Sequence, residues 1–251
     1  MASMLGPEWR MPSFDHVVDP YDRARPGYPP GVFDELEPLE GRRVLDAGAG
    51  TGIATRALAA RGAEVVALDV GVQLLTRTRL HSPGVAVVAG DGAVLPFGGE
   101  SFDVVCFAQS WHWLNPTTRS AEVARVLRPG GRWAAWWSHA RADTEPWYRR
   151  YWDAIEVACP GTHRSQRDTD WGRTIDITRL AICPRITVPW RRLVSVDDWM
   201  MDLWSHSYIA ALAEPDRTDL LNRLQEIVRA RFPDERMEVP YETWLWIATL
   251  V

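Results

Sequence analysis

The chain has 251 residues, enough to bury a substantial core, and its 46% apolar and 24% charged residues are near the averages of globular proteins. Its 28 basic residues besides His are all Arg, its formal net charge is −5 and like charges do not cluster, so electrostatic binding to nucleic acid is not expected. Three scattered cysteines are too few for a disulfide framework or a zinc cluster, and no run approaches the roughly 20 apolar residues of a membrane span.

These properties predict a cytoplasmic protein, a monomer or a homodimer, with no metal site, nucleic-acid partner or membrane partner. The first twelve residues lack the basic and then apolar pattern of a signal peptide. Residues 1–40 are expected to form an arm, rich in Pro, Gly and Asp, that ends in a short helix at 32–39.

A glycine-rich segment follows a predicted strand at 43–45 and precedes a predicted helix at 53–59. Gly48, Gly50 and Gly52 lie two residues apart, and glycine permits a sharp bend with no Cβ to keep a ligand from the main chain. The third glycine of a pyrophosphate-binding fingerprint would fall at Ile53. Asp46, before the bend, can hold the turn or an amino group of a ligand. The alternative is a plain turn between strand and helix.

Acidic residues end the next two predicted strands. Asp69 follows the strand at 64–68 and lies 21 positions after Gly48, where an acid accepts hydrogen bonds from ribose hydroxyls. A helix is predicted at 72–80 and a third strand at 85–89, followed by Asp91. Asp91 can accept a hydrogen bond from the exocyclic amine of an adenine, although an ordinary turn aspartate would give the same pattern.

The alternation continues with strands at 102–107 and 132–137 and a helix at 116–127 between them. Such alternation predicts a parallel sheet with helices on both faces, and residues 41–139 form its cofactor-binding core. Residues 140–185 show no clear strand, contain a predicted helix at 145–158 and are interpreted as a cover that binds substrate. Residues 186–251 are expected to complete the sheet, with strands at 185–195 and 239–250 and helices at 196–207 and 215–230.

The pattern D-x-G-x-G-x-G from Asp46 to Gly52 resembles motif I of the class I S-adenosylmethionine-dependent methyltransferases. Asp69, the run 90–92 and the turn at 127–131 add to this resemblance. The segments 21–28 and 109–113 resemble the small-molecule branch that includes trans-aconitate methyltransferase-like enzymes with a methyltransferase type 11 domain. The resemblance implies an α/β fold: a three-layer, Rossmann-like architecture whose seven-stranded, mostly parallel sheet has an antiparallel last strand, plus a helical cover.

The resemblance also implies S-adenosyl-L-methionine as cofactor and S-adenosyl-L-homocysteine as product, with the arm closing over the cofactor. The glycine bend would face the methionine part, Asp69 the ribose, and Asp91 with Gly92 the adenine, while Arg25 could pair with the carboxylate. The implied cofactor-binding residues are Tyr21, Arg25, Asp46, Gly48, Ala49, Gly50, Gly52, Asp69, Val70, Asp91, Gly92, Ala108 and Gln109.

His112 is the candidate catalytic base, because it follows the fourth strand and its ordinary pKa of about 6.5 suits proton removal near neutrality. The alternative is a histidine that packs between Trp111 and Trp113 without exchanging protons. The candidate substrate-binding residues are Trp111, Trp113, His139 and Trp147. Trp152 and Trp171 can also wall an apolar or aromatic acceptor, although core packing is the alternative for any single tryptophan. Arg141, Arg149 and Arg150 would suit an acidic acceptor, and a solvated surface is the alternative for them.

The predicted function is methyl transfer from S-adenosylmethionine to a small molecule, with an oxygen, nitrogen or carbon acceptor left open. A protein that binds the cofactor without turnover is one alternative. A nicotinamide-dependent oxidoreductase is another, and Ile53 and Asp46 both speak against it.

Overall fold

The computed structural model describes residues 25–161, 169–176, 178–204 and 206–251. The amino-terminal half alternates strands and helices, as predicted. In chain order the elements are α2 Pro30–Asp34, β1 Arg43–Ala47, α3 Ile53–Ala59, β2 Glu64–Asp69, α4 Val72–His81, β3 Ala86–Ala89, β4 Phe102–Ala108, the 3-10 turn η2 Trp111–Trp113, α5 Arg119–Val126 and β5 Leu127–Ala140.

The carboxyl-terminal half contributes more helix than strand. Its elements are α6 Pro146–Ala158, the 3-10 turn η3 Trp171–Thr174, β6 Leu180–Ile182, β7 Ile186–Ser195, α8 Val196–Trp204, α9 Ser207–Ala210, α10 Glu214–Arg231 and β8 Arg236–Leu250. No helix among the described residues is long and apolar enough to cross a membrane.

Several elements differ from the sequence prediction; β5 and β8, for example, begin at Leu127 and Arg236 instead of at 132 and 239. Helix α2 ends at Asp34 instead of at 39, because a proline at 38 disfavours helical geometry in the residue before it. Helix α5 begins at Arg119 instead of at 116, since the Asn115 side chain accepts a hydrogen bond from the Thr117 N–H and forms a turn first. Strand β6 lies where no strand was predicted, and its three residues are too few to show a period.

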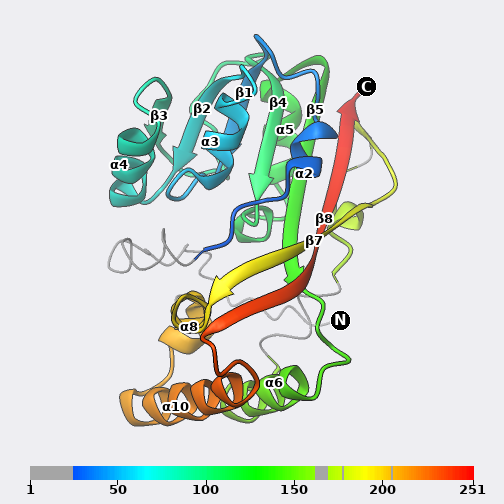
Figure 1. Cartoon of the computed structure of the whole chain (residues 1–251). Coiled ribbons are helices and arrows are strands. Elements are labelled where there is room, and N and C mark those ends of the chain that lie inside the picture. Colours follow the sequence, from blue (N-terminus) through cyan, green and yellow to red (C-terminus); the bar gives the residue numbers. More distant parts are fainter. Residues whose placement is uncertain (1–24, 162–168, 177, 205) are drawn as a thin grey trace.

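The strands form one mixed sheet with the order β3-β2-β1-β4-β5-β8-β6, and β7 pairs with β8 beside β6. Strands β1 to β5 pair in parallel, whereas β8 runs antiparallel to β5, β6 and β7. This confirms the predicted fold class, with an antiparallel last strand, although the described residues form eight strands where seven were predicted, because β6 and β7 both pair with β8. Parallel strands end at one edge of a sheet, and β1, β2 and β4 point their carboxyl ends toward the same side of the molecule (Figure 1).

The sheet is covered on both faces by apolar packing. On one face α2 and α3 pack Phe33 and Leu58 near Trp136 of β5. On the other face α5 and η2 pack with Trp133 of β5 and Trp246 of β8. Trp133, Trp136 and Trp246 have less than 3% of their surface exposed, so these three large rings belong to the core of the sheet.

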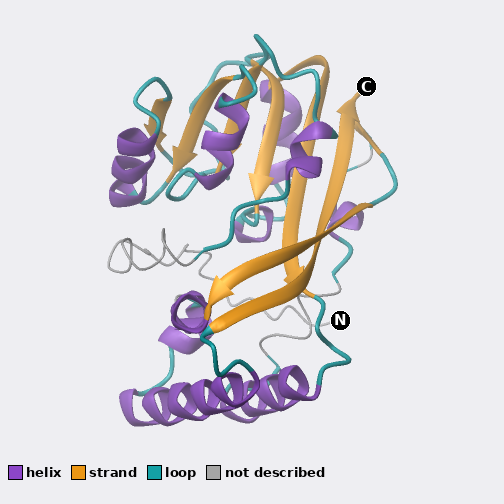
Figure 2. Cartoon of the chain, viewed as in Figure 1, coloured by secondary structure: helices purple, strands orange, loops and turns teal. Residues whose placement is uncertain are grey.

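A second apolar core lies outside the sheet. Strands β7 and β8 continue past the other strands as a long pair, and α6, α8 and α10 gather at its far end (Figures 1 and 2). Trp147 of α6, Trp199 of α8 and Leu224 of α10 are buried together there with Tyr241 of β8. We call α6, α8 and α10 with the adjoining ends of β7 and β8 the helical cover. It draws on segments on both sides of β6 and β7.

Candidate functional site

The glycine bend is tied to the neighbouring strands. The N–H groups of Gly48 and Ala49 both donate to the Leu68 carbonyl at 2.8 and 3.0 Å. A Cβ on Gly48 would lie 2.4 Å from the Ser110 Cβ, and one on Gly52 would lie 2.9 Å from the Thr78 Cγ2. Gly50 also has a positive φ of +59°, but a Cβ there would meet no described atom within 4 Å. Two glycines therefore allow close packing, and at Gly50 there is open space where a side chain would stand.

Asp69, at the tip of β2, joins the bend to the next helix. Its Oδ2 accepts the Gly50 N–H at 2.8 Å and its Oδ1 accepts the Gly71 N–H at 2.8 Å. These two bonds hold the carboxylate at the tip of β2, where the sequence predicts a partner for ribose hydroxyls. The neighbouring Val70 has 39% of its surface exposed, unusual for a large apolar side chain beside a buried strand.

Asp46 lies behind the bend and not on its open side. The side chain is fully buried, the Thr55 hydroxyl donates to Oδ2 at 2.6 Å, and the Cys106 Sγ lies 4.0 Å from Oδ1. Burial raises the pKa of Asp46 to about 6; the Thr55 hydrogen bond lowers it and the charge of Asp69 adds to the rise. Of the two roles that the sequence allows, this geometry favours holding the turn.

Asp91 and Gly92 follow the tip of β3, beside the other acids. The Gly90 N–H donates to the Asp69 carbonyl at 3.0 Å, which ties this tip to that of β2. The exposed Asp91 accepts the Ala93 N–H at 2.8 Å, and a Cβ on Gly92 would lie 2.7 Å from the Leu114 side chain.

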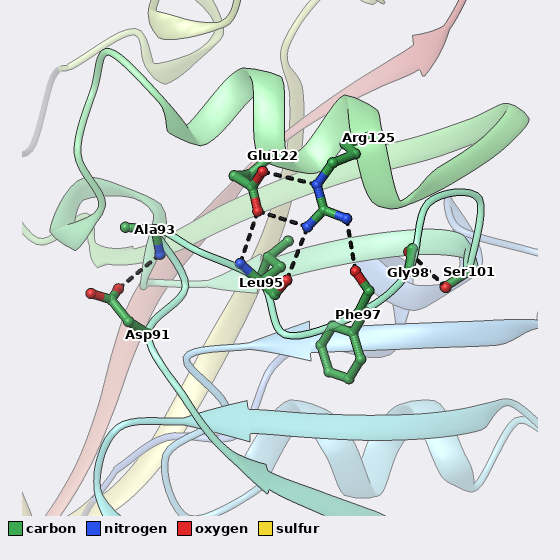
Figure 3. A network of polar contacts seen from close by, with 8 residues as sticks. All are labelled: Asp91, Ala93, Leu95, Phe97, Gly98, Ser101, Glu122 and Arg125. Atoms are coloured by element: carbon green, nitrogen blue, oxygen red, sulfur yellow. Dashed lines mark hydrogen bonds and ion pairs between the residues drawn. The ribbon is translucent and has the colours of Figure 1, made fainter.

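The loop after Asp91 is fixed from behind by α5. Glu122 accepts the Leu95 N–H at 2.9 Å, while Arg125 donates to the Leu95 and Phe97 carbonyls at 2.9 and 2.7 Å. Figure 3 shows the Asp91 carboxylate turned away from this Glu122–Arg125 pair. The pair therefore anchors the loop and leaves the acid available at the edge of the sheet.

The tip of β4 turns sharply at Gln109, which has a φ of +58°. A non-glycine residue in this region costs roughly 1–2 kcal/mol, so the surrounding contacts must enforce it. The Gln109 N–H donates to the Trp136 carbonyl at 2.9 Å, and the Ser110 hydroxyl donates to the Ala47 carbonyl at 2.6 Å. The turn thus brings the half-buried Ala108 and Gln109 beside the end of β1.

Two residues of the arm, Tyr21 and Arg25, were predicted to bind the cofactor. Tyr21 lies outside the described residues. Arg25 forms an ion pair with Asp202 of α8, with 3.4 Å between Nε and Oδ1, so in this structure it contacts the helical cover. The arm reaches the strand tips through Tyr28, whose hydroxyl accepts a 3.5 Å hydrogen bond from the Gln109 amide and whose ring packs edge-on against Trp136.

Aromatic rings surround His112 beyond the tip of β4. Its ring centre lies 4.6 Å from that of Trp113, 5.7 Å from Trp171 and 6.0 Å from Trp137. Trp137 and Trp171 stack at 4.8 Å with their planes 16° apart. We call these four residues the aromatic cluster. Burial, with a smaller contribution from the charge of Arg119, lowers the pKa of His112 to about 4, so its imidazole is neutral at physiological pH.

The predicted substrate residues separate into two groups. Trp113 and His139 are half-buried, and His139 packs its ring 5.3 Å from Trp244. Trp111 is fully buried between Phe107 and Trp133 in the core of the sheet. Trp147 is 3% exposed, inside the helical cover. Core packing therefore already takes up the surfaces of Trp111 and Trp147.

The three arginines considered for an acidic acceptor differ in their surroundings. Arg141 forms an ion pair with Glu242 at 3.2 Å and lies over the Trp244 ring, whereas Arg149 and Arg150 are exposed on α6. Among the described residues, no group of three or more His, Cys, Asp or Glu side chains is placed to hold a metal.

Sequence reasoning missed the residues that support the site. Ser110 and Thr78 pack against the bend glycines, and Thr78 donates to the Gly50 carbonyl at 2.9 Å. Trp137 carries an indole N–H that reaches His112. Ser110 could have been recognised because it carries a hydroxyl group and lies directly after a strand tip. Nothing in the local sequence distinguishes Trp137 from the core tryptophans beside it.

Known proteins resemble this chain in sequence and in fold. Residues 45–135 match a family profile described as a methyltransferase domain. An uncharacterized methyltransferase of Mycobacterium tuberculosis is 43% identical over 143 residues, which cover 57% of this chain and 58% of the relative. An uncharacterized methyltransferase-like protein of Schizosaccharomyces pombe is 30% identical over 231 residues, or 86% of each chain.

A solved structure shows the same fold. It is that of a candidate type II methyltransferase from Anaeromyxobacter dehalogenans, which superposes with a TM-score of 0.67 at 23% identity. The superposition covers 90% of this chain and 97% of that one. It therefore extends beyond the cofactor core into the helical cover.

Proposed function

The chain belongs to the class I S-adenosylmethionine-dependent methyltransferases, and on that premise we propose that it transfers the methyl group of S-adenosylmethionine to a small-molecule acceptor. One observation carries the proposal: the bend is unobstructed at the Cβ position of Gly50, the Gly50 N–H donates to the Asp69 carboxylate, and the tip carrying Asp91 is hydrogen-bonded to that of Asp69. This combination suits S-adenosylmethionine: an unobstructed bend accommodates its methionine part, and acids at the strand tips accept hydrogen bonds from its adenosyl group.

The described residues fit this cofactor by their chemistry. The bend at Gly48 to Gly52 would hold the methionine part, Asp69 the ribose hydroxyls, and Asp91 with Gly92 the adenine. Val70, Ala108 and Gln109 would border it at the tips of β2 and β4. When bound, the cofactor supplies a methyl group on a positively charged sulfur, which is an intrinsically reactive donor.

The protein's main contribution to such a transfer is positioning. Holding an acceptor in line with the reacting bond, without free rotation, can supply about 7–11 kcal/mol of the barrier. The segment carrying His112 and Trp113 follows the tip of β4 and the turn at Gln109, which supports a position beside the cofactor region. Aromatic side chains there can orient an acceptor and favour the cationic sulfur through cation–π contact.

The small-molecule nature of the acceptor is supported by charge and by the lining of the site. A net charge of −5 without a basic cluster disfavours a nucleic acid, and the segment beyond β4 is aromatic. Binding of the cofactor without turnover is the main alternative. The nicotinamide alternative remains disfavoured by Ile53 and by the buried acid Asp46.

Calorimetry with S-adenosylmethionine and with NADH tests the cofactor assignment. We expect S-adenosylmethionine to bind and NADH not to bind. Asp69→Ala should weaken the affinity about 100-fold, because it removes charge-assisted hydrogen bonds worth roughly 1.5–3 kcal/mol each. Asp103→Ala is the matched control: Asp103 lies near the opposite end of β4, paired with Arg128, and should leave the affinity unchanged.

Turnover is measured separately, by incubating the protein with methyl-labelled cofactor and a metabolite extract. Labelled product supports the enzyme and rejects the binding-only alternative. NADH binding in the absence of S-adenosylmethionine binding would reject the proposed function.

A further inference from the structure

The hydrogen bond to His112 determines which of its ring nitrogens carries the proton. The Trp137 indole N–H points to the His112 Nδ1 across 3.4 Å. Indole nitrogen is only a donor, so Nδ1 must be the acceptor. A neutral imidazole has one protonated nitrogen, and the proton therefore resides on Nε2. In this tautomer the remaining functional group of His112 is an N–H donor.

Arg119 fixes the segment that carries this imidazole. Its guanidinium is buried, with 4% of the residue exposed; it donates from Nη1 to the Trp111 carbonyl at 2.8 Å and lies 4.5 Å over the Trp111 ring. Within the described part of the chain Arg119 forms no ion pair with a carboxylate. The positive charge of Arg119, which has no carboxylate partner among the described residues, therefore opposes the gain of a second proton by His112.

The neighbouring rings oppose that protonation as well. Trp113 and Trp171 lie against the imidazole with ring planes inclined at 40° and 38°, and the packing removes water from it. Arg119 is the one charged group that acts on His112 among the described residues, and no carboxylate faces it to favour an imidazolium. The environment thus stabilises a neutral donor and is unsuited to a base that must take up and release protons near pH 7.

We propose that His112 binds the methyl acceptor as a hydrogen-bond donor through Nε2–H and removes no proton from it, with Trp137 and Arg119 as its positioning residues. The inference rests on the proposed methyl transfer. It assigns the acceptor to molecules that carry a hydrogen-bond-accepting oxygen and whose reacting atom has no proton to lose. In the transfer a lone pair of that atom forms the bond to the methyl carbon, the electron pair of the broken C–S bond stays on sulfur, and the Nε2 proton stays on His112.

The tautomer is measured directly by long-range ¹H–¹⁵N NMR on the full-length protein, with the His112 signals assigned by their loss in His112→Gln. We expect the Nε2–H form throughout pH 5.5–8. Trp137→Phe, which removes the donor to Nδ1, should release a mixture of both tautomers. A His112 titration centred between pH 6 and 7, or an Nδ1–H form, would overturn the inference. This measurement needs no acceptor, so it can fail while cofactor binding and the proposed function stand.

Two substitutions separate a donor from a base. The amide of His112→Gln places an N–H donor near the position of Nε2 but cannot act as a base, whereas His112→Leu keeps bulk and removes the donor. With methyl-labelled cofactor and metabolite extract, we expect His112→Gln to retain turnover within about threefold. His112→Leu should lose about 100-fold, as for other positioned donors. Both should bind S-adenosylmethionine like the wild type.

The pH dependence gives a further readout, which a purely structural role would not move. A neutral donor predicts parallel rate profiles for the wild type and His112→Gln from pH 5.5 to 8. Loss of turnover in both variants, together with a wild-type rate that falls below pH 6.5, would identify a base. Full turnover in both variants would equally overturn the proposal.

Discussion

The cofactor half of the site and the helical cover are held together by different kinds of interaction. In the cofactor half, short side chains bond to main chain: Asp69 and Thr78 to Gly50, and Ser110 to Ala47. In the helical cover, long side chains bond to one another: Arg192 of β7 donates to Asp202 of α8 at 2.7 Å and to the Tyr241 hydroxyl at 3.0 Å.

This contrast suggests that the two regions serve different purposes: the bend sets the geometry of cofactor binding, and the helical cover contributes to the stability of the fold. The bend needs specific backbone angles and small residues. Its geometry is therefore determined by the few residues next to each strand tip. The helical cover encloses a buried charge pair within an apolar core. Burial alone would raise the pKa of Asp202, but the charges of Arg25 and Arg192 outweigh it and hold that pKa below its ordinary value. We therefore expect changes in the cover to affect stability and changes at the bend to affect binding.

Breaking the buried pair should produce the largest effect. Arg192→Met keeps most of the apolar volume but leaves Asp202 in the interior with Arg25 as its remaining cation, at a cost of about 3 kcal/mol in the free energy of unfolding. Denaturant unfolding measures this cost. Hydrogen exchange should show the loss of protection in α8 and α10, with β1 and β2 unaffected.

Arg191→Met is the matched control for this prediction. Arg191 is the preceding residue in β7, and its pair with Glu238 is exposed, with 68% and 52% of the two side chains accessible. Such surface pairs contribute about 0–1 kcal/mol, so the free energy of unfolding should hardly change. If Arg192→Met weakened cofactor binding tenfold while leaving stability intact, the division between the two regions would be wrong.

An alanine in the bend should have the next largest effect, and on binding. Gly50→Ala places a methyl group on the open side of the bend, where we expect about a tenfold loss of affinity for S-adenosylmethionine. Gly41→Ala is its control: Gly41 has a similar φ of +67°, and a Cβ there likewise meets no described atom within 4 Å. Both variants should lose about 1–2 kcal/mol of stability through left-handed strain. Equal affinities of the two for the cofactor would show that Gly50 does not face it.

The sequence predicted the cofactor half closely because its determinants are local. Apolar runs marked β1, β2 and β4, and parallel strands must end on one edge, so acids after such runs fall together. Asp69 and Asp91 lie at that edge, as expected. The sequence did not reveal that Asp46 faces away from the open side, because its orientation depends on Thr55 in the following helix.

The helical cover was less predictable because its contacts join distant segments. The pattern of α6 marks an apolar face but not its partner, and α10, which packs against it, follows β7 and α8 in the chain. Strand β6 was missed for its shortness. The tautomer of His112 depends on Trp137 of β5, and nothing in the local sequence marks that tryptophan as a partner of His112.

Asp46→Asn should have the smallest effect, and it tests whether this acid belongs to the bend or to the ligand. Because the pKa of Asp46 rises from 3.8 to about 6 on folding, the folded state binds more protons between these values, and wild-type stability falls as the pH rises through that window. The variant removes this titration. At pH 7 it should gain on the order of 1 kcal/mol, since a weaker hydrogen bond from Thr55 offsets part of the relief. Affinity for S-adenosylmethionine should change less than about threefold, because the carboxylate is fully buried. A tenfold loss of affinity with unchanged pH dependence of unfolding would instead make Asp46 a direct contact to an amino group of the cofactor.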